Sequence, residues 1–445
     1  MKKVLIISYH FPPMGGGGVM RALKFSKYLP QFGWIPIILT ANSSPLFRDE
    51  SLLNDLDPRI KIIRTSLSQF TKLKYSFIRK LISSRKPTNI KKNEGVDLSN
   101  IIVKILTYLN NKIEKAFFIP DIYILWRRKA VSEAQKIIKE EKIDLLFTTS
   151  PPHSIQLIGK IISEKTGIPW ISDFRDDWIN NPLFTNKFII QKYLGAKQEK
   201  SVINNTNKII TATESIKQDM LKRHAGRLRD NNVTVITNGY DPDDFNNEGS
   251  ILPLNKNRLT FSYYGNIGGT RSSLPLLEGI RIAKEKNKHL INDIVINFIG
   301  IFGDSKKHWY KSIGDSVNFI SPLNHTECIK NMKRSDILLL ILNYNEGGGG
   351  VLTGKIFEYI ASKKPIFAII PKGTTQEFIK NENLGFVADY HNPNEIAEAI
   401  TDIYQQWKNN KLVTSASKKI LSKYDRKELT RKLSQEFNTT LKLCL

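Results

Sequence analysis

The chain has 445 residues, 40% of them apolar and 24% charged, with a net charge of +25 and two cysteines. This composition excludes an intrinsically disordered chain and a disulfide framework, and the lack of any apolar run of ~18 residues excludes a membrane-spanning protein. The length suffices for two or three domains, and because no signal peptide precedes the first strand-like segment, we expect a cytoplasmic location.

The N-terminal half alternates short apolar segments with segments of helical periodicity. Strands are expected at 4–7, 35–39, 60–63, 144–148, 170–173, 208–213 and 233–237, and helices at 19–29, 101–118, 126–141, 153–166 and 214–224. Strands that alternate with helices of this length are typical of a parallel sheet covered by helices on both faces.

A basic segment interrupts this series. From Arg59 to Asn93 there are eleven Lys and Arg and no Asp or Glu, with apolar residues spaced among them. Because each cation near an anionic membrane contributes ~1 kcal/mol, this segment predicts contact with a membrane surface; a solvated insertion, at about 66–116, is the alternative. No nucleic-acid partner is expected, since no nucleic-acid-binding motif accompanies the charge.

A polar stretch at 241–258 separates a second alternating series, which supports a linker between two domains. Its strands are expected at 259–264, 294–299, 317–320, 337–342, 366–370 and 386–388, and its helices at 273–286, 353–362, 394–407 and 426–443. We therefore predict an α/β protein with two Rossmann-like, doubly wound parallel-sheet domains that face a central cleft. Ligands bind such sheets at the carboxyl ends of their strands.

A glycine run before a helix is the strongest candidate site. Four consecutive glycines, ending in Gly349 and Gly350, follow a strand, and a helix begins near Thr353. Backbone N–H groups at such a turn bind anions, and Lys355 in the first helical turn can add a full charge to a diphosphate. Glu358, one turn further on, can accept hydrogen bonds from two ribose hydroxyls. A flexible surface loop with a charge pair is the alternative.

Two further strand-to-helix turns are candidates for the same ligand. Gly17 and Gly18 end a second run of four glycines, but no acidic residue ends the next strand, so a dinucleotide cofactor is not expected. Gly265 and Asn266 follow the first strand of the second domain, and Arg271 stands at the entry to its helix. That arginine can clamp phosphate oxygens from the other side.

Polar clusters after two strands of the first domain are candidates for chemistry. His153 follows one strand, and Arg175, Asp176 and Asp177 follow another. An arginine-bound aspartate usually has a positioning role, whereas a free one nearby can take a proton. His153 and Asp176 are thus the catalytic candidates, and Arg175 and Asp177 the acceptor-side candidates. His153 can equally be a helix-start residue without a role.

Seven motifs stand in order along the chain. They are Tyr9-His10-Phe11-Pro12-Pro13 with glycines 15–18, Phe118-Ile119-Pro120-Asp121 with Trp126, Ser150-Pro151-Pro152-His153, Asp173-Phe174-Arg175-Asp176-Asp177-Trp178, Asn238-Gly239-Tyr240-Asp241 with Phe245, Tyr264-Gly265-Asn266 and Lys355-Ile356-Phe357-Glu358-Tyr359. Together they resemble the bacterial family 4 (GT4-type) retaining glycosyltransferases of the GT-B fold, found in capsule, O-antigen and exopolysaccharide assembly.

The resemblance implies a role for each part of the chain. Residues 246–425 would form the domain that binds a nucleoside-diphosphate sugar, and residues 1–245 the domain that binds the acceptor. The last helix, in 426–445, would pack back on the first domain. Glu358 would bind the ribose, and Lys355 would face the diphosphate. No metal or other cofactor is expected, because cations and helix dipoles stabilise the leaving group.

Two positions depart from the family pattern. Gly350 stands eight residues before Glu358, where the family has the first glutamate of its signature. His153 is offset by a few positions from the histidine that many relatives place near the donor sugar. The resemblance therefore implies the donor pocket more firmly than the catalytic step.

The predicted function is transfer of a sugar, with retention, from a nucleoside-diphosphate sugar to a saccharide or lipid-linked saccharide, in surface polysaccharide biosynthesis. A peripheral position on the inner face of the plasma membrane would suit such an acceptor. Two alternatives stay open. A nucleotide-sugar 2-epimerase of the same fold would need no acceptor, and a non-catalytic binding subunit would not hydrolyse the donor.

Overall fold

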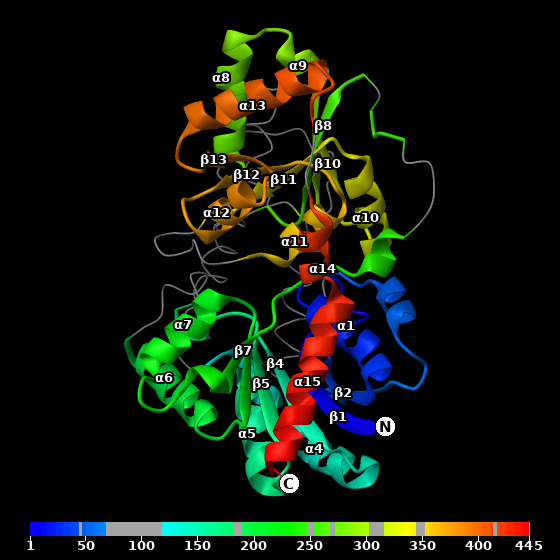
Figure 1. Cartoon of the computed structure of the whole chain (residues 1–445), viewed down its shortest axis with the longest axis vertical. Helices are drawn as coiled ribbons and strands as arrows, with labels where there is room; N and C mark the ends of the chain where they lie inside the picture. The colour runs from blue at the N-terminus through cyan, green and yellow to red at the C-terminus, as the bar shows by residue number, and fades with distance from the viewer. Residues whose placement is uncertain are drawn as a thin grey trace, which may run out of the picture.

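The computed structural model describes residues 1–444 apart from 44–46, 68–117, 181–188, 247–251, 256, 268–271, 302–315, 344–351 and 413–415. Two parallel sheets form two domains, one above the other in Figure 1. The strand orders are β3-β2-β1-β4-β5-β6-β7 and β10-β9-β8-β11-β12-β13. The predicted fold class, two Rossmann-like domains of the GT-B type, is confirmed.

The first sheet is buried on both faces. Its strands are β1 (Lys2–Ile7), β2 (Trp34–Asn42), β3 (Lys61–Ser66), β4 (Leu145–Ser150), β5 (Trp170–Phe174), β6 (Lys208–Thr211) and β7 (Val233–Val235). Its helices are α1 (Met20–Tyr28), α4 (Arg127–Glu141), α5 (Ser154–Thr166), α6 (Ile189–Ile203) and α7 (Glu214–Arg223). Leu5 and Ile7 of β1 pack in the core on one face of the sheet, and Val4 and Ile6 pack in the core on the other face. Because both faces are buried, the sequence of β1 is continuously apolar.

The second sheet follows the same design. Its strands are β8 (Leu259–Tyr264), β9 (Ile294–Ile299), β10 (Val317–Ile320), β11 (Ile337–Ile341), β12 (Ile366–Ile370) and β13 (Gly385–Asp389). Its helices are α8 (Leu274–Lys286), α9 (Leu290–Asp293), α10 (His325–Arg334), α11 (Gly354–Ala361), α12 (Thr374–Asn381), α13 (Pro393–Lys408) and α14 (Lys418–Lys423). Residues of β8 and β11 divide between two cores, so helices cover both faces here as well.

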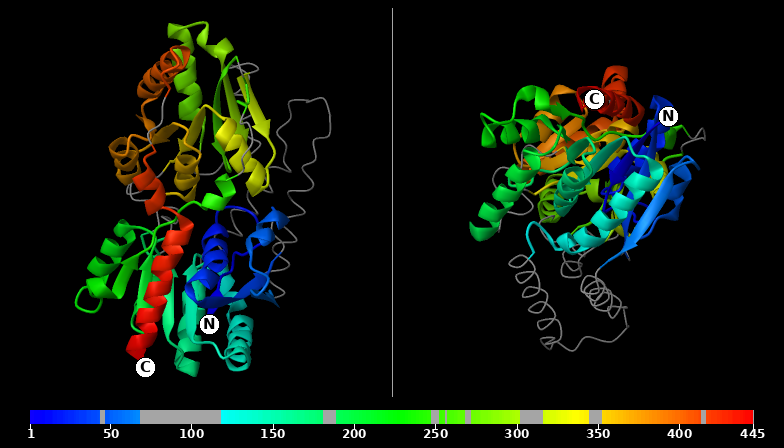
Figure 2. Two further views of the ribbon diagram at one scale, coloured as in Figure 1. Left: turned by 45° about the vertical axis from the view of Figure 1, so that its right-hand side comes forward. Right: turned by 90° about the horizontal axis from the view of Figure 1, so that it is seen from below.

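The last helix, α15 (Arg426–Cys444), returns to the first domain (Figure 2). Its buried Phe437 contacts the rings of Trp34 and Phe147, with centroid distances of 5.2 and 5.4 Å. Leu429, Leu433 and Leu441 belong to the same core as β1 and α1. The C-terminal helix is thus part of the first domain's core, and it ties the second domain to it.

The chain crosses between the domains twice, and the two crossings pair with each other. The N–H of Tyr240 donates to the carbonyl of Tyr424 (3.0 Å), and the N–H of Arg426 donates to the carbonyl of Tyr240 (2.9 Å). A Cβ on Gly239 would lie 2.2 Å from the Tyr424 oxygen. Only glycine lets the two crossings approach this closely.

A buried charge cluster fixes the first crossing against the first domain. Lys24 on α1 is 1% exposed, and its Nζ lies 2.5, 2.7 and 2.9 Å from carboxylate oxygens of Asp55, Asp241 and Asp244. Burial alone would lower the pKa of Lys24, but these charges raise it. Burial alone would raise the pKa of Asp241, but the charge of Lys24 and its hydrogen bond lower that pKa to about 2. Lys24 and Asp241 therefore stabilise each other's charged forms.

Most of the predicted basic segment lies outside the described residues, as do most of the insertion at 66–116 and the helix expected at 101–118. In the described part, Arg59 pairs with Asp57 (2.6 Å) and Lys61 with Glu141 (2.8 Å). Among the described residues, no helix is both long enough and apolar enough to span a membrane.

Replacing Lys24 by methionine should destabilise the protein strongly. The substitution removes the buried cation and leaves only Lys27 beside Asp241 and Asp55, and breaking a buried ion pair costs about 3–5 kcal/mol. We expect a lower midpoint of urea unfolding. Lys61→Met, in an exposed ion pair, is the matched control and should change stability by less than about 1 kcal/mol. Equal effects of the two substitutions would contradict this account.

Candidate functional site

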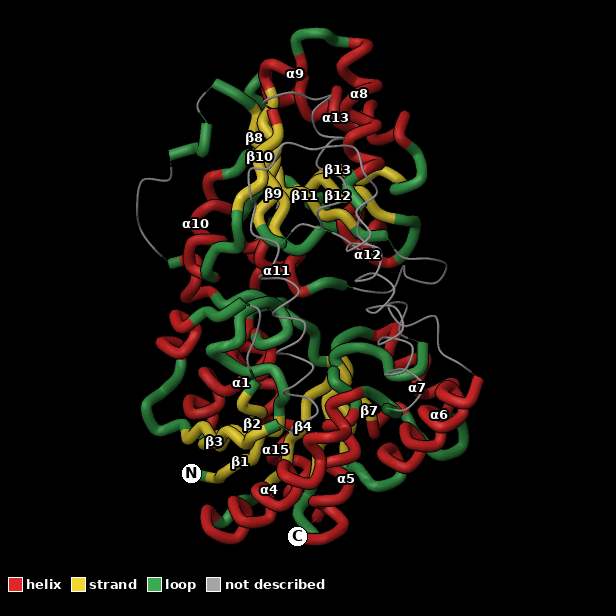
Figure 3. Tube along the Cα trace, turned by 180° about the vertical axis from the view of Figure 1, so that it is seen from behind, coloured by secondary structure: helices red, strands yellow, loops and turns green. Residues whose placement is uncertain are grey.

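The loops that follow strands of both sheets meet between the two domains (Figure 3). From the second domain, α11 follows β11 and points its N-terminus into this region, with Lys355 in its first turn. From the first domain, the turns after β1, β5, β6 and β7 approach from the opposite side. This is the position at which parallel α/β sheets bind ligands.

Lys355 is positioned by the end of β8. Its Nζ lies 4.9 Å from the centre of the Tyr263 ring, and a Cβ on Gly265 would lie 2.0 Å from that nitrogen. Gly265 has a φ of 134°, which only glycine adopts without strain, and its N–H donates to the Ile299 carbonyl (2.8 Å). The glycine thus makes room for the ammonium group, and Lys355 and Gly265, both predicted as donor-binding residues, lie together.

Asn266 has a structural contact in the same turn. Its side-chain oxygen accepts a hydrogen bond from the N–H of Ile301 (3.4 Å), and its carbonyl accepts one from the Tyr263 hydroxyl (3.3 Å). These bonds join the loops after β8 and β9. The other predicted donor residues, Arg271, Gly349 and Gly350, lie outside the described residues, so they remain predictions.

Glu358 is half-buried on α11, one turn after Lys355. Burial raises the pKa of its carboxyl, and the charge of His325 opposes that rise. The charge of Asp244 raises the pKa of Glu358 further, and the charge of Arg426 lowers it. Arg426 is 3% exposed, and its Nε donates to the Gly239 carbonyl (3.0 Å). Burial outweighs these two cations, so the pKa of Glu358 lies above the usual range of a carboxyl group.

His325 is a site residue that the sequence patterns did not identify. It begins α10, and its backbone N–H donates to Asp49 of the first domain (2.8 Å). Its Nε2 lies 3.0 Å from a carboxylate oxygen of Asp244. Burial alone would lower the pKa of His325, but the bond to Asp244 and the charge of Glu358 raise it. His325 thus connects both domains with the predicted ribose-binding carboxylate.

At the edge of the first domain, the predicted residues Gly17, Gly18, Arg175 and Asp176 lie near His10. Arg175 donates from Nη1 to the carbonyl of Gly18 (2.8 Å), and its Nη2 lies 3.7 Å from a carboxylate oxygen of Asp176. A Cβ on Gly18 would lie 3.8 Å from the ring of His10, whereas one on Gly17 would meet no described atom within 4 Å. Burial, with the charge of Arg175, lowers the pKa of His10 to about 4, so its imidazole is neutral at pH 7.

His153 packs as a structural residue. It is buried, and its ring stacks on Trp178 with a centroid distance of 5.1 Å and an interplanar angle of 11°. Asp121 accepts a hydrogen bond from the N–H of Ser154 (3.0 Å) and so caps α5 beside it. These contacts favour the alternative already stated for His153, that of a helix-start residue.

Asp177 also has structural partners. Its two carboxylate oxygens lie 3.0 and 3.2 Å from the guanidinium of Arg223, and one of them accepts the N–H groups of Ile179 and Asn180. With both oxygens occupied, Asp177 holds α7 and the turn after β5 together. We therefore do not assign it to an acceptor.

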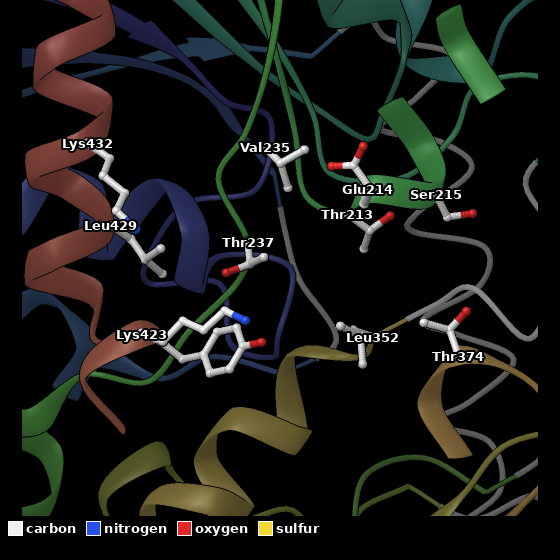
Figure 4. A pocket seen from close by; sticks show the side chains of 11 residues that line it. Thr213, Glu214, Ser215, Val235, Thr237, Leu352, Thr374, Lys423, Leu429 and Lys432 are labelled. Atoms are coloured by element: carbon white, nitrogen blue, oxygen red, sulfur yellow. The ribbon is translucent and has the colours of Figure 1, made fainter. Parts of the chain in front are cut away.

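A pocket of about 320 Å³ opens between the domains beside the two crossings (Figure 4). Glu214 from the start of α7 and Thr374 from the start of α12 line it on one side, and Lys423 and Lys432 on the other (Figure 4). It reaches α11 through Leu352. Of the predicted site residues that the structure describes, none lines this pocket.

Among the described residues, one cluster of carboxylates has a geometry that could hold a divalent metal, but its contacts do not favour one. Asp55, Asp241 and Asp244 have oxygens within 4.8 Å of one another. The ammonium of Lys24 already bonds to all three. The cluster therefore already holds a cation between its carboxylates.

The second domain resembles a known protein family. Residues 246–420 match the family model described as "Glycosyl transferases group 1". No curated protein matches the chain in sequence.

Several solved structures share the fold over nearly the whole chain. HepE from Anabaena, in complex with UDP and glucose, is 13% identical, covers 99% of this chain and 100% of its own, and has a TM-score of 0.62. A glycosyltransferase from Rickettsia africae is 16% identical over 99% of both chains (TM-score 0.63). WaaG, a glycosyltransferase involved in lipopolysaccharide biosynthesis, is 13% identical over 97% of this chain and 99% of its own (TM-score 0.61).

Replacing His325 by asparagine should destabilise the protein more in acid than in base. Because the pKa of His325 is raised in the folded state, its contribution is fully present below its ordinary pKa and is lost as pH rises through the folded value. We expect a larger drop in melting temperature at about pH 6 than at about pH 9.

The exposed His289 provides the control. His289→Asn should shift the melting temperature by the same small amount at both pH values. A His325→Asn shift that does not depend on pH would contradict the ion pair with Asp244.

Proposed function

We propose that the protein transfers a glycosyl unit from a nucleoside-diphosphate sugar to a saccharide or lipid-linked saccharide, with retention of anomeric configuration. The observation that carries this proposal is the pair Lys355 and Glu358 at the start of α11, within the domain that matches the group 1 glycosyltransferases. Solved structures of the same fold contain UDP, HepE among them, which makes UDP the first nucleotide to test.

The second domain would hold the donor through charge. Lys355 and the N-terminus of α11 would bind the diphosphate, joined by Arg271, Gly349 and Gly350. As the bond from the sugar's anomeric carbon to the diphosphate breaks, negative charge develops on the leaving oxygen, and fixed cations stabilise it. This arrangement requires no metal.

Glu358 would accept hydrogen bonds from the ribose hydroxyls, which requires its ionised form. His325 and Arg426 both favour that form. A buried carboxylate is more stable when cations lie beside it. The ribose would thus bind against a carboxyl group whose protonation two nearby cations oppose.

The acceptor would bind at the edge of the first domain. Gly17 leaves room for a sugar, and Arg175 and Asp176 lie beside it. The acceptor oxygen would form the new bond to the anomeric carbon while its proton passes to a base or to the departing diphosphate. Asp176 and the neutral His10 are the groups here that can accept a proton.

The proposal extends to the cellular setting. Surface polysaccharide assembly on a lipid carrier would place the protein at the inner face of the plasma membrane. The net charge of +25 and the basic segment Arg59–Asn93 support a peripheral contact with anionic lipids. That segment lies mostly outside the described residues.

Replacing Glu358 by glutamine or Lys355 by methionine should weaken nucleotide binding. Each substitution removes a charge-assisted hydrogen bond, so we expect at least about a tenfold loss of affinity for the diphosphate that binds best. Calorimetric titration with UDP and GDP measures it. Glu377→Gln and Lys380→Met, on the exposed side of α12 in the same domain, are the matched controls and should bind normally.

Unchanged binding in both site variants would overturn the proposal. Product analysis then separates the enzyme classes. Transfer requires an acceptor and releases a nucleoside diphosphate, whereas an epimerase converts the donor alone. If the protein neither converts the donor nor slowly hydrolyses it, a non-catalytic binding subunit is favoured.

A further inference from the structure

The exposed face of α6 is apolar where a globular protein is usually polar. Ile189 and Ile190, at the start of the helix, are 88% and 66% exposed, and Tyr193 and Leu194, one turn on, are 68% and 38% exposed. Four large apolar side chains on two successive turns form a contiguous patch. The helix lies on the outer flank of the first domain (Figure 1).

The opposite face of α6 is polar and buried. Glu199 is 1% exposed and pairs with Arg223 (2.9 Å) and His224 (3.0 Å) on α7. Gln191 is also buried. These bonds fix which way the helix faces, so the apolar residues point outward because the polar contacts of the other face require it.

The outward face also carries positive charge and no negative charge. Lys192, Lys197 and Lys200 are exposed, whereas Glu199, the one acidic residue of the helix, is turned inward and paired. An apolar patch flanked by lysines matches the interface of an anionic bilayer, where side chains enter the headgroup region and ammonium groups meet phosphates.

We propose that this face of α6, residues 189–200, docks the protein on an anionic membrane surface. Charge complementarity selects this occupant: the chain carries +25 overall, which opposes self-association through a cationic face and favours an anionic partner. The proposal extends the proposed function, since α6 belongs to the acceptor-side domain and would bring that domain to a lipid-linked acceptor.

Vesicle binding tests the proposal without any transfer assay. The full chain should co-sediment with vesicles of phosphatidylglycerol and phosphatidylcholine and bind vesicles of phosphatidylcholine alone far less. The double variant Ile189→Ser with Ile190→Ser should lose at least about tenfold in affinity for the vesicles. It removes two aliphatic side chains that would be buried in the bilayer interface in the bound state. Leu443→Ser, at an 82% exposed leucine on α15, is the matched control and should bind normally.

The charged part of the face has its own variant. Lys197→Gln with Lys200→Gln should lower affinity for the anionic vesicles about fivefold or more and reduce its sensitivity to salt. Lys284→Gln with Lys286→Gln, on exposed positions of α8, should do neither. Circular dichroism confirms that each variant folds.

Two outcomes would overturn the docking proposal. One is vesicle binding that all α6 variants retain. The other is an α6 double variant that changes the oligomeric state by light scattering and leaves vesicle binding intact, which would make this face a self-association surface. Nucleotide titration of the same variants keeps the two proposals apart, since donor binding should be unchanged in them whether or not vesicles bind.

Discussion

The buried ammonium of Lys24 is the interaction on which the arrangement of the two domains depends. It gathers Asp55, Asp241 and Asp244 around one point, so the linker that leaves the first domain is fixed against α1. Desolvating one cation and three carboxylates is unfavourable unless all are paired, and a partly satisfied cluster would be worse than none. The linker therefore has one strongly preferred path, and the second domain starts from a defined position.

That position reaches the candidate donor site through a short series of contacts. Asp244 bonds to both Lys24 and His325, and His325 carries a charge that acts on Glu358. Arg426, held by the carbonyl of Gly239 at the paired crossings, acts on the same carboxylate. The cations that oppose protonation of Glu358 thus lie at the contacts that join the domains.

Much of the fold follows from the sequence because buried parallel strands are short, continuous apolar runs. The start of α11 was also predictable, and Lys355 and Glu358 lie on this helix as expected. Helix α6 was not predicted, because the buried Gln191 and exposed Ile189 invert the usual pattern. The role of His325 depends on Asp49 and Asp244, far away in sequence, and no local spacing encodes such a contact.

The most direct test of the central claim is a crystal structure with a nucleoside diphosphate bound. The account predicts the diphosphate within hydrogen-bonding distance of the Lys355 ammonium and the ribose hydroxyls on the Glu358 carboxylate, with His325 still bonded to Asp244. A nucleotide seated instead in the pocket between Glu214 and Lys423, without contact to Lys355 or Glu358, would contradict it.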